Sequence, residues 1–424
     1  MRLTSWGNLS LDDYQTFFYD FNPNLLAKIP KPVIAVGASR SYGDVGLNHL
    51  GSNLLTTNLN RFINLDGNLV TAQAGINFAE LEKVLNLHKL SLPVRPGTSY
   101  LTLGGAVAND IHGKNHHLQG SFGCHIKSMR IWRSDSGVIE ISTQREPDLF
   151  FATIGGIGLT GLIIDVTFEA TEFLGNQIKV ENLVFSNLSE FNQINQSSQN
   201  YETSVSWVNI SGKKNGNGIY SRGNTVPEFA KKITKAPISY PKNLKLNFIN
   251  STSIKIFNNL YQNLQKSIKI SLVPAGKYYF PLDGVNNWNQ VYGAKGFYQY
   301  QSVVPEKNAY EVTEEMLNLM KEEKTYSFLT VLKSFGDKSS GGLLSFPMAG
   351  LTFAIDLQNQ GEATLKLMNQ FDQIIQRAGG RVYLAKDARM SREFFESSYP
   401  NYEKFNSLRD PYFSSDLSRR LLGF

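Results

Sequence analysis

The sequence predicts an α+β protein with two domains or one large composite domain. The chain has 424 residues, of which 41% are hydrophobic and 18% charged, so it can bury a substantial core. Short β-rich runs and helical runs follow one another irregularly, and several strand runs end in glycine turns. No internal repeat or low-complexity tract stands out.

Composition narrows the class of protein. The single cysteine, Cys124, excludes an intrachain disulfide framework and a cysteine-based zinc site, and it fits a reducing compartment. The N-terminus has no apolar core of signal-peptide length and no run of eighteen apolar residues occurs. We therefore expect a cytoplasmic protein without a membrane span. No helix-turn-helix, zinc-finger or RNP signature is present, so no nucleic-acid partner is expected.

The surplus of positive charge, +6 overall, is concentrated in residues 229–282. This segment contains no Asp or Glu and mixes lysines with Ile, Leu, Phe and Tyr. Such a mixture suits an anionic membrane surface or a phosphate-bearing substrate, although a solvated lysine face explains it equally well. The lysines are Lys231, Lys232, Lys235, Lys242, Lys245, Lys255, Lys266, Lys269 and Lys277.

In chain order, the first predicted strand, residues 32–36, runs into a glycine turn between Gly37 and Gly43. A loop of this kind presents backbone N–H groups that can bind a pyrophosphate. Two β-rich runs, 54–60 and 69–75, follow, separated by a turn at 66–68. Residues 77–90 have the apolar spacing of a helix, with Asn77 as its N-cap.

Residues 97–117 hold glycines and small residues, followed by His112 and Lys114. Small residues let a backbone approach a flat or phosphorylated ligand closely. The alternative is a tight structural turn beside a few surface histidines.

A glycine motif at 156–161 matches GxGxxG formally, but its surroundings are wrong for a Rossmann site. Residues 128–143 read as a hairpin with its turn at 134–137, and 145–156 read as a short helix. A helix therefore precedes the motif and a strand, 162–170, follows it. We reject nicotinamide binding here and retain a glycine turn that brings a strand to a ligand.

The second half contains strands at 295–306, 328–336, 351–359 and 381–385, with helices at 309–324 and 364–380. The period-two pattern of 298–301 puts Gln299 and Gln301 on one strand face. That face can bind a hydroxyl-rich ligand or be an ordinary exposed sheet face. Lys386 directly follows the last strand.

Three long motifs in this order, GASRSYGD, PGTSYLTLGGAVANDIHGKNHH and IGGIGLTG, resemble the vanillyl-alcohol-oxidase-type (PCMH) FAD-binding oxidoreductases. The likeness continues through YYFPLD, QYQSVVP, LSFPM, RVYLAKDAR and DLSRRL, nearly end to end. Within that family it is greatest to the oxidases of polyprenyl-phosphate pentoses.

The resemblance implies a two-part FAD domain, 1–176 with a C-terminal return at 381–424, and an inserted antiparallel-sheet substrate domain, 177–380. It also implies the residues that contact FAD. These are Gly37, Ala38, Ser39, Arg40, Ser41, Tyr42, Gly43, Gly97, Thr102, Gly104, Gly105, Asn109, His112, Ile163 and Tyr383.

The cofactor is expected to be noncovalent. Many relatives tether FAD through a histidine in the first glycine loop, and the matching position here is Ser41, which has no nucleophilic nitrogen. Ser99 and Tyr100 stand near the position of a tethering cysteine in others, and Cys124 lies away from it.

The resemblance also assigns the chemistry. Lys386 is the candidate for positioning or deprotonating the substrate hydroxyl, with His112 and Tyr42 beside it, while the flavin accepts hydride. Tyr279, Gln299, Gln301, Lys333 and Thr352 match pocket residues, and Lys333 is an alternative phosphate ligand. The family's Asn and Cys in one strand become Thr352 and Ala354 here. Lys114, His116 and His117 have no assigned role.

The resulting hypothesis is oxidation of the 2′-hydroxyl of a polyprenyl-phosphate pentose to a ketone. This is the first half of an epimerisation used to make arabinose units for cell-wall polysaccharide, and a short-chain reductase partner completes it. The basic segment would contact the inner membrane face peripherally. Alternatives are a soluble sugar-alcohol or aldonolactone oxidase and a non-catalytic flavin-binding scaffold.

Overall fold

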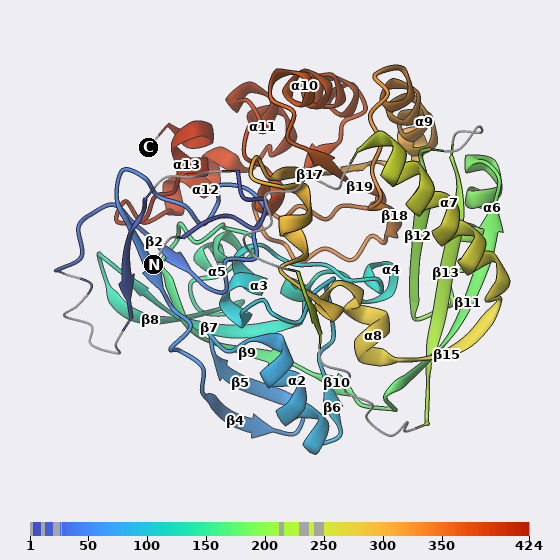
Figure 1. The fold of residues 1–424 in the computed structure, drawn as a ribbon. Coiled ribbons are helices and arrows are strands. Elements are labelled where there is room, and N and C mark those ends of the chain that lie inside the picture. The colour runs from blue at the N-terminus through green and yellow to red at the C-terminus, as the bar shows by residue number, and fades with distance from the viewer. Residues whose placement is uncertain are drawn as a thin grey trace.

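The computed structural model describes residues 3–9, 13–19, 26, 28–211, 216–228, 237–240 and 250–423. Five lysines of the basic segment lie outside this range, namely Lys231, Lys232, Lys235, Lys242 and Lys245. Figure 1 shows the described chain as a lower-left body of sheets and a second body, at the right and top, built around one large sheet.

The first body contains a parallel sheet and an antiparallel sheet. The parallel sheet has the order β1-β3-β2, with β1 at Gln15–Phe18, β2 at Val33–Val36 and β3 at Ser52–Leu55. The antiparallel sheet has the order β4-β5-β9-β7-β8. Its strands are β4 (Phe62–Asp66), β5 (Leu69–Gln73), β7 (Ile126–Arg133), β8 (Gly137–Ser142) and β9 (Leu162–Glu169). The hairpin expected at 128–143 is confirmed. The turn at 66–68 is also confirmed, but the strand before it is β4, at Phe62–Asp66, whereas the predicted run 54–60 overlaps β3 of the parallel sheet.

Short helices connect these strands. Helix α2 (Phe78–Leu87) begins where the side chain of Asn77 accepts a hydrogen bond from the Glu80 N–H, as the sequence predicts. Helix α3 (Leu103–Ala108) contacts β5 and β9. Helix α5 (Pro147–Thr153) precedes the GxGxxG motif and β9 follows it, which confirms the inverted context that argued against a Rossmann site.

The second body is built on an eight-stranded antiparallel sheet with the order β15-β11-β13-β12-β18-β19-β17-β20. Its strands are β11 (Gln177–Phe185), β12 (Thr203–Asn209), β13 (Asn217–Val226), β15 (Ile270–Pro274), β17 (Phe297–Val304), β18 (Thr330–Phe335), β19 (Gly350–Gln358) and β20 (Arg381–Val382). Directly opposed residues of antiparallel strands share a face. Gln301 is opposite Ala354, which is opposite Val331, so these three positions lie on one face.

The opposite face of this sheet packs against helices. Helices α9 (Glu306–Glu322) and α10 (Glu362–Arg377) contact each other and the strands β17 and β19. Tyr300, Phe353 and Ile355 point into this core and are nearly inaccessible to water. Helix α7 (Ser251–Ser267) lies on the other face, the one with Gln301, because its Tyr261 packs on Trp207, which is opposite Val331. It contacts β11 and β13 and stands at the right of Figure 1.

The remaining elements are short. The helices are α4 (His116–Gln119), α6 (Leu188–Gln196), α8 (Ala275–Tyr279), α11 (Arg392–Ser398), α12 (Tyr402–Leu408) and α13 (Asp416–Leu422). The 3₁₀ turns are η1 (Phe122–His125), η2 (Pro281–Gly284), η3 (Trp288–Tyr292) and η4 (Leu384–Lys386). Strand β6 (Leu90–Ser91) pairs with β10 (Thr171–Glu172), and β14 (Ile238–Ser239) pairs with β16 (Val285–Asn286).

The C-terminal segment returns to the first glycine loop. The strand predicted at 381–385 is wrong beyond Val382, because β20 lies at the sheet edge and the chain then turns into η4. This turn puts the Ala385 and Asp387 carbonyls against the loop, where they accept from the N–H groups of Tyr42 (3.0 Å) and Asp44 (3.2 Å). Arg420 adds ion pairs to Asp44 and Asp387.

A substitution at Gly43 tests the packing of the C-terminal segment against the first glycine loop. A Cβ added at Gly43 would lie 1.6 Å from the Asp387 carbonyl oxygen, so one backbone segment must move. We expect Gly43→Ala to lower the free energy of unfolding by about 1–3 kcal/mol, the usual cost of overpacking. Thermal and urea unfolding measure the change.

Gly276→Ala is the matched control, because nothing lies within 4 Å of its added Cβ. Its stability should stay within about 0.5 kcal/mol of the parent. Equal stability of the two variants would contradict the close approach at Gly43.

Candidate active site

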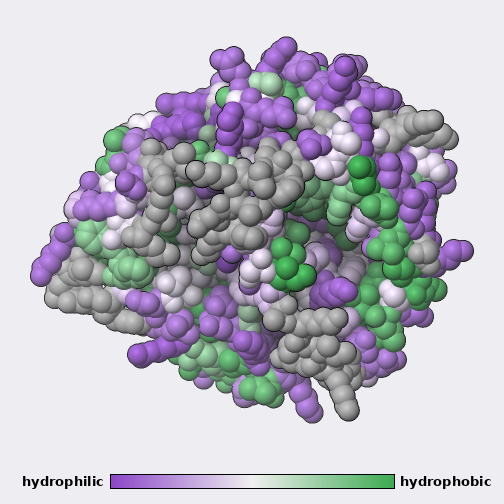
Figure 2. All heavy atoms as spheres, in the orientation of Figure 1, coloured by the Kyte–Doolittle hydropathy of each residue, from purple (hydrophilic) through white to green (hydrophobic). Residues whose placement is uncertain are grey.

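One cavity of 1090 Å³ lies between the two bodies of the structure. Its walls come from the first glycine loop, the region around α3, the polar face of the large sheet, α7 and α8. Ligand pockets for drug-sized molecules are about 300–1,000 Å³, so this one has room for a large cofactor. Figure 2 shows the surface hollowed near the centre of this view.

The cavity gathers the residues singled out in the sequence. All fifteen positions proposed for FAD line it, and so do Lys386, Tyr279, Gln299, Gln301 and Lys333. Thr352 is the exception. It is buried on the same sheet face as Gln301 and Lys333, and its hydroxyl contacts the amide of Gln301.

The glycine loop is shaped for close backbone approach. A Cβ at Gly37 would lie 2.1 Å from the Thr102 hydroxyl oxygen, so the loop can rest on the start of α3 only as glycine. Thr102 caps α3 by accepting from the Gly105 N–H. Within the described chain, Asn109 Oδ1 and Arg40 Nε are buried without a hydrogen-bond partner. These polar atoms fit a polar cofactor.

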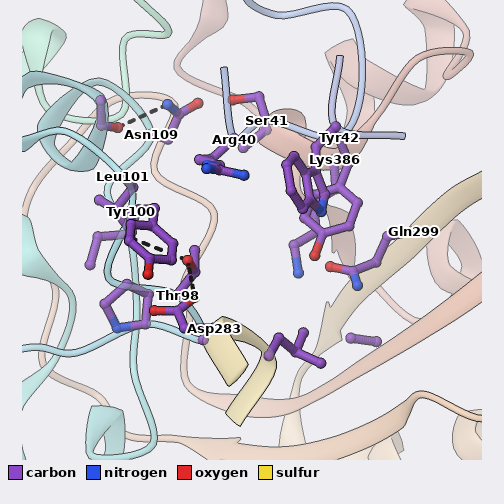
Figure 3. Close-up of a pocket in the computed structure, with 18 of the residues that line it drawn as sticks. Arg40, Ser41, Tyr42, Thr98, Tyr100, Leu101, Asn109, Asp283, Gln299 and Lys386 are labelled. Atoms are coloured by element: carbon purple, nitrogen blue, oxygen red, sulfur yellow. Dashed lines mark hydrogen bonds between the residues drawn. The ribbon is translucent and has the colours of Figure 1, made fainter. Parts of the chain in front are cut away.

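Figure 3 shows the labelled residues in two groups, with Tyr42, Lys386 and Gln299 on one side and Asn109, Tyr100, Thr98 and Asp283 on the other. Arg40 stands between them. Its guanidinium carbon lies 4.2 Å from the ring centroid of Trp6 and 5.5 Å from that of Tyr100. Asp283 of η2 accepts from Thr98 Oγ1 at 2.6 Å and from Ser99 N–H at 2.7 Å. These bonds join η2 to the loop that contains Gly97.

His112 sits at the meeting point of the two bodies. Its Nε2 is 3.0 Å from Gln301 Nε2 and its Nδ1 is 3.3 Å from Lys333 Nζ. The ring packs against Phe335, Phe346 and Tyr383, with centroids 4.7, 5.8 and 5.6 Å away. Burial, and then the charges of Lys333 and Lys386, hold the pKa of His112 well below its usual value, so the imidazole is neutral.

The amide of Gln301 has a fixed orientation. Thr352 donates its hydroxyl hydrogen to the Ser302 carbonyl at 2.8 Å, so Thr352 Oγ1 must accept from Gln301 Nε2 at 3.0 Å. The same Nε2 lies 3.0 Å from His112 Nε2 and can donate to it when the imidazole hydrogen is on Nδ1. Gln301 Oε1 is left buried without a partner in the described structure, available to accept from a hydroxyl.

Lys386 lies beside two aromatic rings. Its Nζ is 5.4 Å from the centroid of Tyr42 and 5.9 Å from that of Tyr383. Removal from water, and then the charge of Lys333, lowers the pKa of Lys386 to about 7, while Asp356 acts in the opposite direction. A partly buried lysine with this pKa can take up a proton near neutral pH.

Asp356 is a residue that the sequence analysis missed. It accepts from Gln299 Nε2 at 2.5 Å and from the Tyr292 hydroxyl at 3.1 Å, and burial raises its pKa to about 7. Asp356 lies two residues after Ala354 on β19, so the alternation of side chains along this strand puts it on the same face, opposite Gln299. That alternation would have identified it.

Asp110 is a second residue that was missed. Its buried carboxylate accepts from the Gly123 N–H and from the hydroxyls of Ser121, Ser340 and Ser345. It therefore fixes the segment before His112 to the loop that leads into β19. No local sequence pattern signals this contact, since Ser340 is 230 residues away.

The fold, the cavity and its residues define a flavin-dependent oxidoreductase. Residues 25–142 match the family described as the FAD binding domain, and they contain the glycine loop and the region through His112. Decaprenylphosphoryl-β-D-ribose oxidase of Mycolicibacterium smegmatis is 34% identical over 411 residues, covering 92% of this chain and 89% of its own. The chain belongs to this oxidase family and is an FAD-dependent enzyme, which confirms the resemblance seen in the sequence.

Two other relatives differ in the share of the chain that they cover. An uncharacterised protein from the mprA 5′ region of Streptomyces coelicolor is 26% identical over 80% of this chain and all of its own. L-galactono-1,4-lactone dehydrogenase 2 of Oryza sativa is 33% identical over 24% of this chain and 18% of its own. The likeness to the lactone enzyme is thus limited to a short part of the chain.

Among the residues that the structure describes, no helix combines the length and apolar character needed to cross a bilayer.

Proposed function

We propose that this enzyme oxidises the 2′-hydroxyl of a polyprenyl-phosphate pentose, of the decaprenylphosphoryl-ribose kind, to a ketone. The observation that carries the proposal is the 34% identity to a decaprenylphosphoryl-β-D-ribose oxidase over 92% of the chain. The ketone requires a reducing partner, in the class of short-chain reductases, to complete an epimerisation in arabinose and cell-wall polysaccharide synthesis.

The proposed arrangement is a two-part FAD domain, 1–176 with 381–424, around a substrate domain, 177–380. The sheet composition supports it, because β1–β5 and β7–β9 form the parallel and antiparallel sheets of the first body, and seven of the eight strands of the large sheet lie between residues 177 and 380. Strand β20 (Arg381–Val382) is the point where the return segment leaves that sheet. The hydrogen bonds from 42 and 44 to 385 and 387 are the contacts that would bring the return segment to the cofactor loop.

The residues present fit FAD in this cavity. The loop from Gly37 to Gly43 would hold its phosphates, and Asn109 and Arg40 offer the unpaired polar atoms described above. We infer a noncovalent cofactor. Ser41 cannot form a tether, and Cys124 is not among the residues that line the cavity. Acid precipitation separates the two cases, since a noncovalent flavin leaves its yellow colour in the supernatant and a tethered one stays in the pellet.

The mechanism assigns a task to each polar side chain. When bound, FAD supplies the hydride acceptor. Lys386 in its neutral form accepts the proton of the hydroxyl that is oxidised. Gln301 Oε1 accepts from a sugar hydroxyl and His112 keeps the Gln301 amide in place. Tyr42 and Tyr279 line the pocket beside them, and Thr352 supports Gln301 from behind.

The two rival functions fit fewer observations. A sugar-alcohol or aldonolactone oxidase would leave the basic, apolar segment 229–282 without a role, and the match to a lactone dehydrogenase covers only 24% of the chain. A non-catalytic scaffold would have no use for a lysine with a pKa of about 7 inside the cavity.

Anaerobic mixing tests the reaction directly. Purified enzyme should lose its flavin absorbance near 450 nm when mixed with a polyprenyl-phosphate ribose, and free polyols should leave it unchanged. Lys386→Ala should retain the flavin and bleach at least about 100-fold more slowly, the usual contribution of a positioned base.

Three results would each contradict one part of the proposed function. Bleaching by polyols alone would reject the lipid-linked substrate. Wild-type protein that no alcohol bleaches would favour the scaffold. Normal bleaching by Lys386→Ala would reject the role of that lysine.

The rate should rise with pH through about 7. Only neutral Lys386 can accept the proton, and its pKa is lowered to about 7. The bleaching rate should therefore fall about tenfold per pH unit below this value and level off above it. An unperturbed lysine would give a rate still rising at pH 9. Stopped-flow mixing between pH 5.5 and 9 distinguishes these profiles, and a rate that falls with rising pH would contradict the assignment.

We also propose a peripheral contact with an anionic membrane surface, made by α7 and β15. Figure 2 shows hydrophobic surface at the right, over the position of α7. Ile256, Leu260 and Leu264 recur every fourth residue and are 56%, 66% and 61% exposed. The exposed side chains of β15 continue this surface, and the neighbouring described lysines carry the charge that anionic lipid attracts. The residues involved are Ile270, Leu272, Lys255, Lys266, Lys269 and Lys277.

Vesicle sedimentation tests this surface. The enzyme should sediment with phosphatidylglycerol vesicles and not with phosphatidylcholine vesicles, and high salt should weaken the binding. Leu260→Ser with Leu264→Ser should abolish sedimentation. Leu87→Ser, which changes an 82% exposed leucine on α2, is the control and should behave as wild type. Equal sedimentation of both variants would exclude α7 as the contact.

A further inference from the structure

The cavity is strongly unbalanced in charge. Among the described residues that line it, six are basic and a single one, Asp283, is acidic. Asp283 is already occupied by Thr98 and Ser99. The basic residues are Arg40, Arg95, Lys114, Lys277, Lys333 and Lys386. Arg95 has a counter-charge in Glu82 and Lys277 is exposed, but the other four form no ion pair among the described residues. Removing such cations from water without counter-charges is costly, so this cavity favours an anionic occupant.

Two of these cations, Lys114 and Lys333, are close enough for the charge of Lys333 to act on Lys114. Lys114 Nζ donates to the Tyr278 carbonyl of α8 and lies 4.0 Å from the centroid of the Tyr278 ring. Lys333 stands on β18, with its Nζ near His112 Nδ1. Since Lys114 follows His112 by two residues, both amines flank the same imidazole segment.

Neither amine has a carboxylate partner in the described part of the chain. The ion pairs there involve other side chains, such as Arg95, which binds Glu82. Removal from water lowers the pKa of Lys114 to about 7 and that of Lys333 to about 8, and Lys333 adds to the shift at Lys114. Each amine thus gains from an added negative charge.

Arg40 forms a separate positive region. It belongs to the glycine loop and packs on Trp6 and Tyr100, whereas the contacts of Lys114 and Lys333 come from α8, β18 and the His112 segment. One region therefore serves the loop that would hold the cofactor phosphates. The other faces the polar sheet, where Gln301 offers its unpaired oxygen.

Resting on the proposed function, we propose that Lys114 and Lys333 together bind the phosphate of the lipid-linked substrate. They would hold it beside the sugar subsite formed by Gln301 and Lys386. The ring of Tyr278 keeps the Lys114 amine in place, so Lys114, to which the sequence assigned no role, becomes a determinant of specificity for phosphorylated sugars over free ones.

The test separates phosphate recognition from catalysis by using a ligand that has no sugar. Farnesyl phosphate and farnesol are each titrated into the holoenzyme, and the flavin absorbance and fluorescence report binding. Lys114→Met and Lys333→Met should each weaken farnesyl phosphate binding about 10- to 100-fold. Both variants should bind farnesol, which lacks the phosphate, as weakly as the wild type does. Lys366→Met, which alters an exposed lysine on α10, is the control and should bind both ligands as wild type does.

Several outcomes overturn the proposal. Wild type that fails to bind farnesyl phosphate, or Lys114→Met that binds it normally, excludes the site. A Lys114→Met protein that purifies with less FAD would show that this lysine serves the cofactor phosphates instead. Thermal unfolding checks that each variant is folded, and Lys114→Gln replaces Lys114→Met if the latter is not.

Failure of the proposed function leaves a different signature. If no phosphopentose bleaches the flavin but farnesyl phosphate binds through Lys114, the phosphate site stands and the reaction is wrong. If phosphopentoses bleach the flavin with the same concentration dependence in Lys114→Met and wild type, the reaction stands and the phosphate site is wrong.

Discussion

The hydrogen bond between Gln301 and His112 is the contact on which the active-site cavity depends. It joins the segment after α3 to the middle of the large sheet, and Thr352 fixes its direction from behind. The buried carboxylate of Asp110 holds the same segment to the loop before β19. Through these contacts the wall that would hold the cofactor and the wall that would hold the substrate keep one relative position.

This junction also explains the electrostatics. A neutral His112 gives Lys333 no counter-charge, and Lys386 interacts with Lys333 and with Asp356, a carboxyl whose pKa burial raises to about 7. The cavity therefore contains amines that are poised near neutral pH. Such amines can bind an anion or accept a proton, which are the two tasks that oxidation of a phosphorylated sugar requires.

Much of the site could be predicted from the sequence because its signals are local. Three short patterns each have a direct physical explanation. They are the glycine loop at 37–43, the small residues of α3 and the glutamines at alternate positions of β17. The contacts that were missed are long-range. Asp110 meets Ser340 across 230 residues, and Lys114 meets Tyr278 across 164. The last predicted strand was too long because closure of η4 against Gly43 depends on the first glycine loop, far away in the sequence.

The position of the sugar is the most direct test of the account. A crystal structure of the enzyme with FAD and a short-chain polyprenyl-phosphate ribose, grown in the absence of oxygen, shows where the sugar binds. We predict that the oxygen at C2′ lies within hydrogen-bond distance of Lys386 Nζ and that a neighbouring hydroxyl donates to Gln301 Oε1. A sugar bound at the α7 rim, with neither contact, would contradict the central claim.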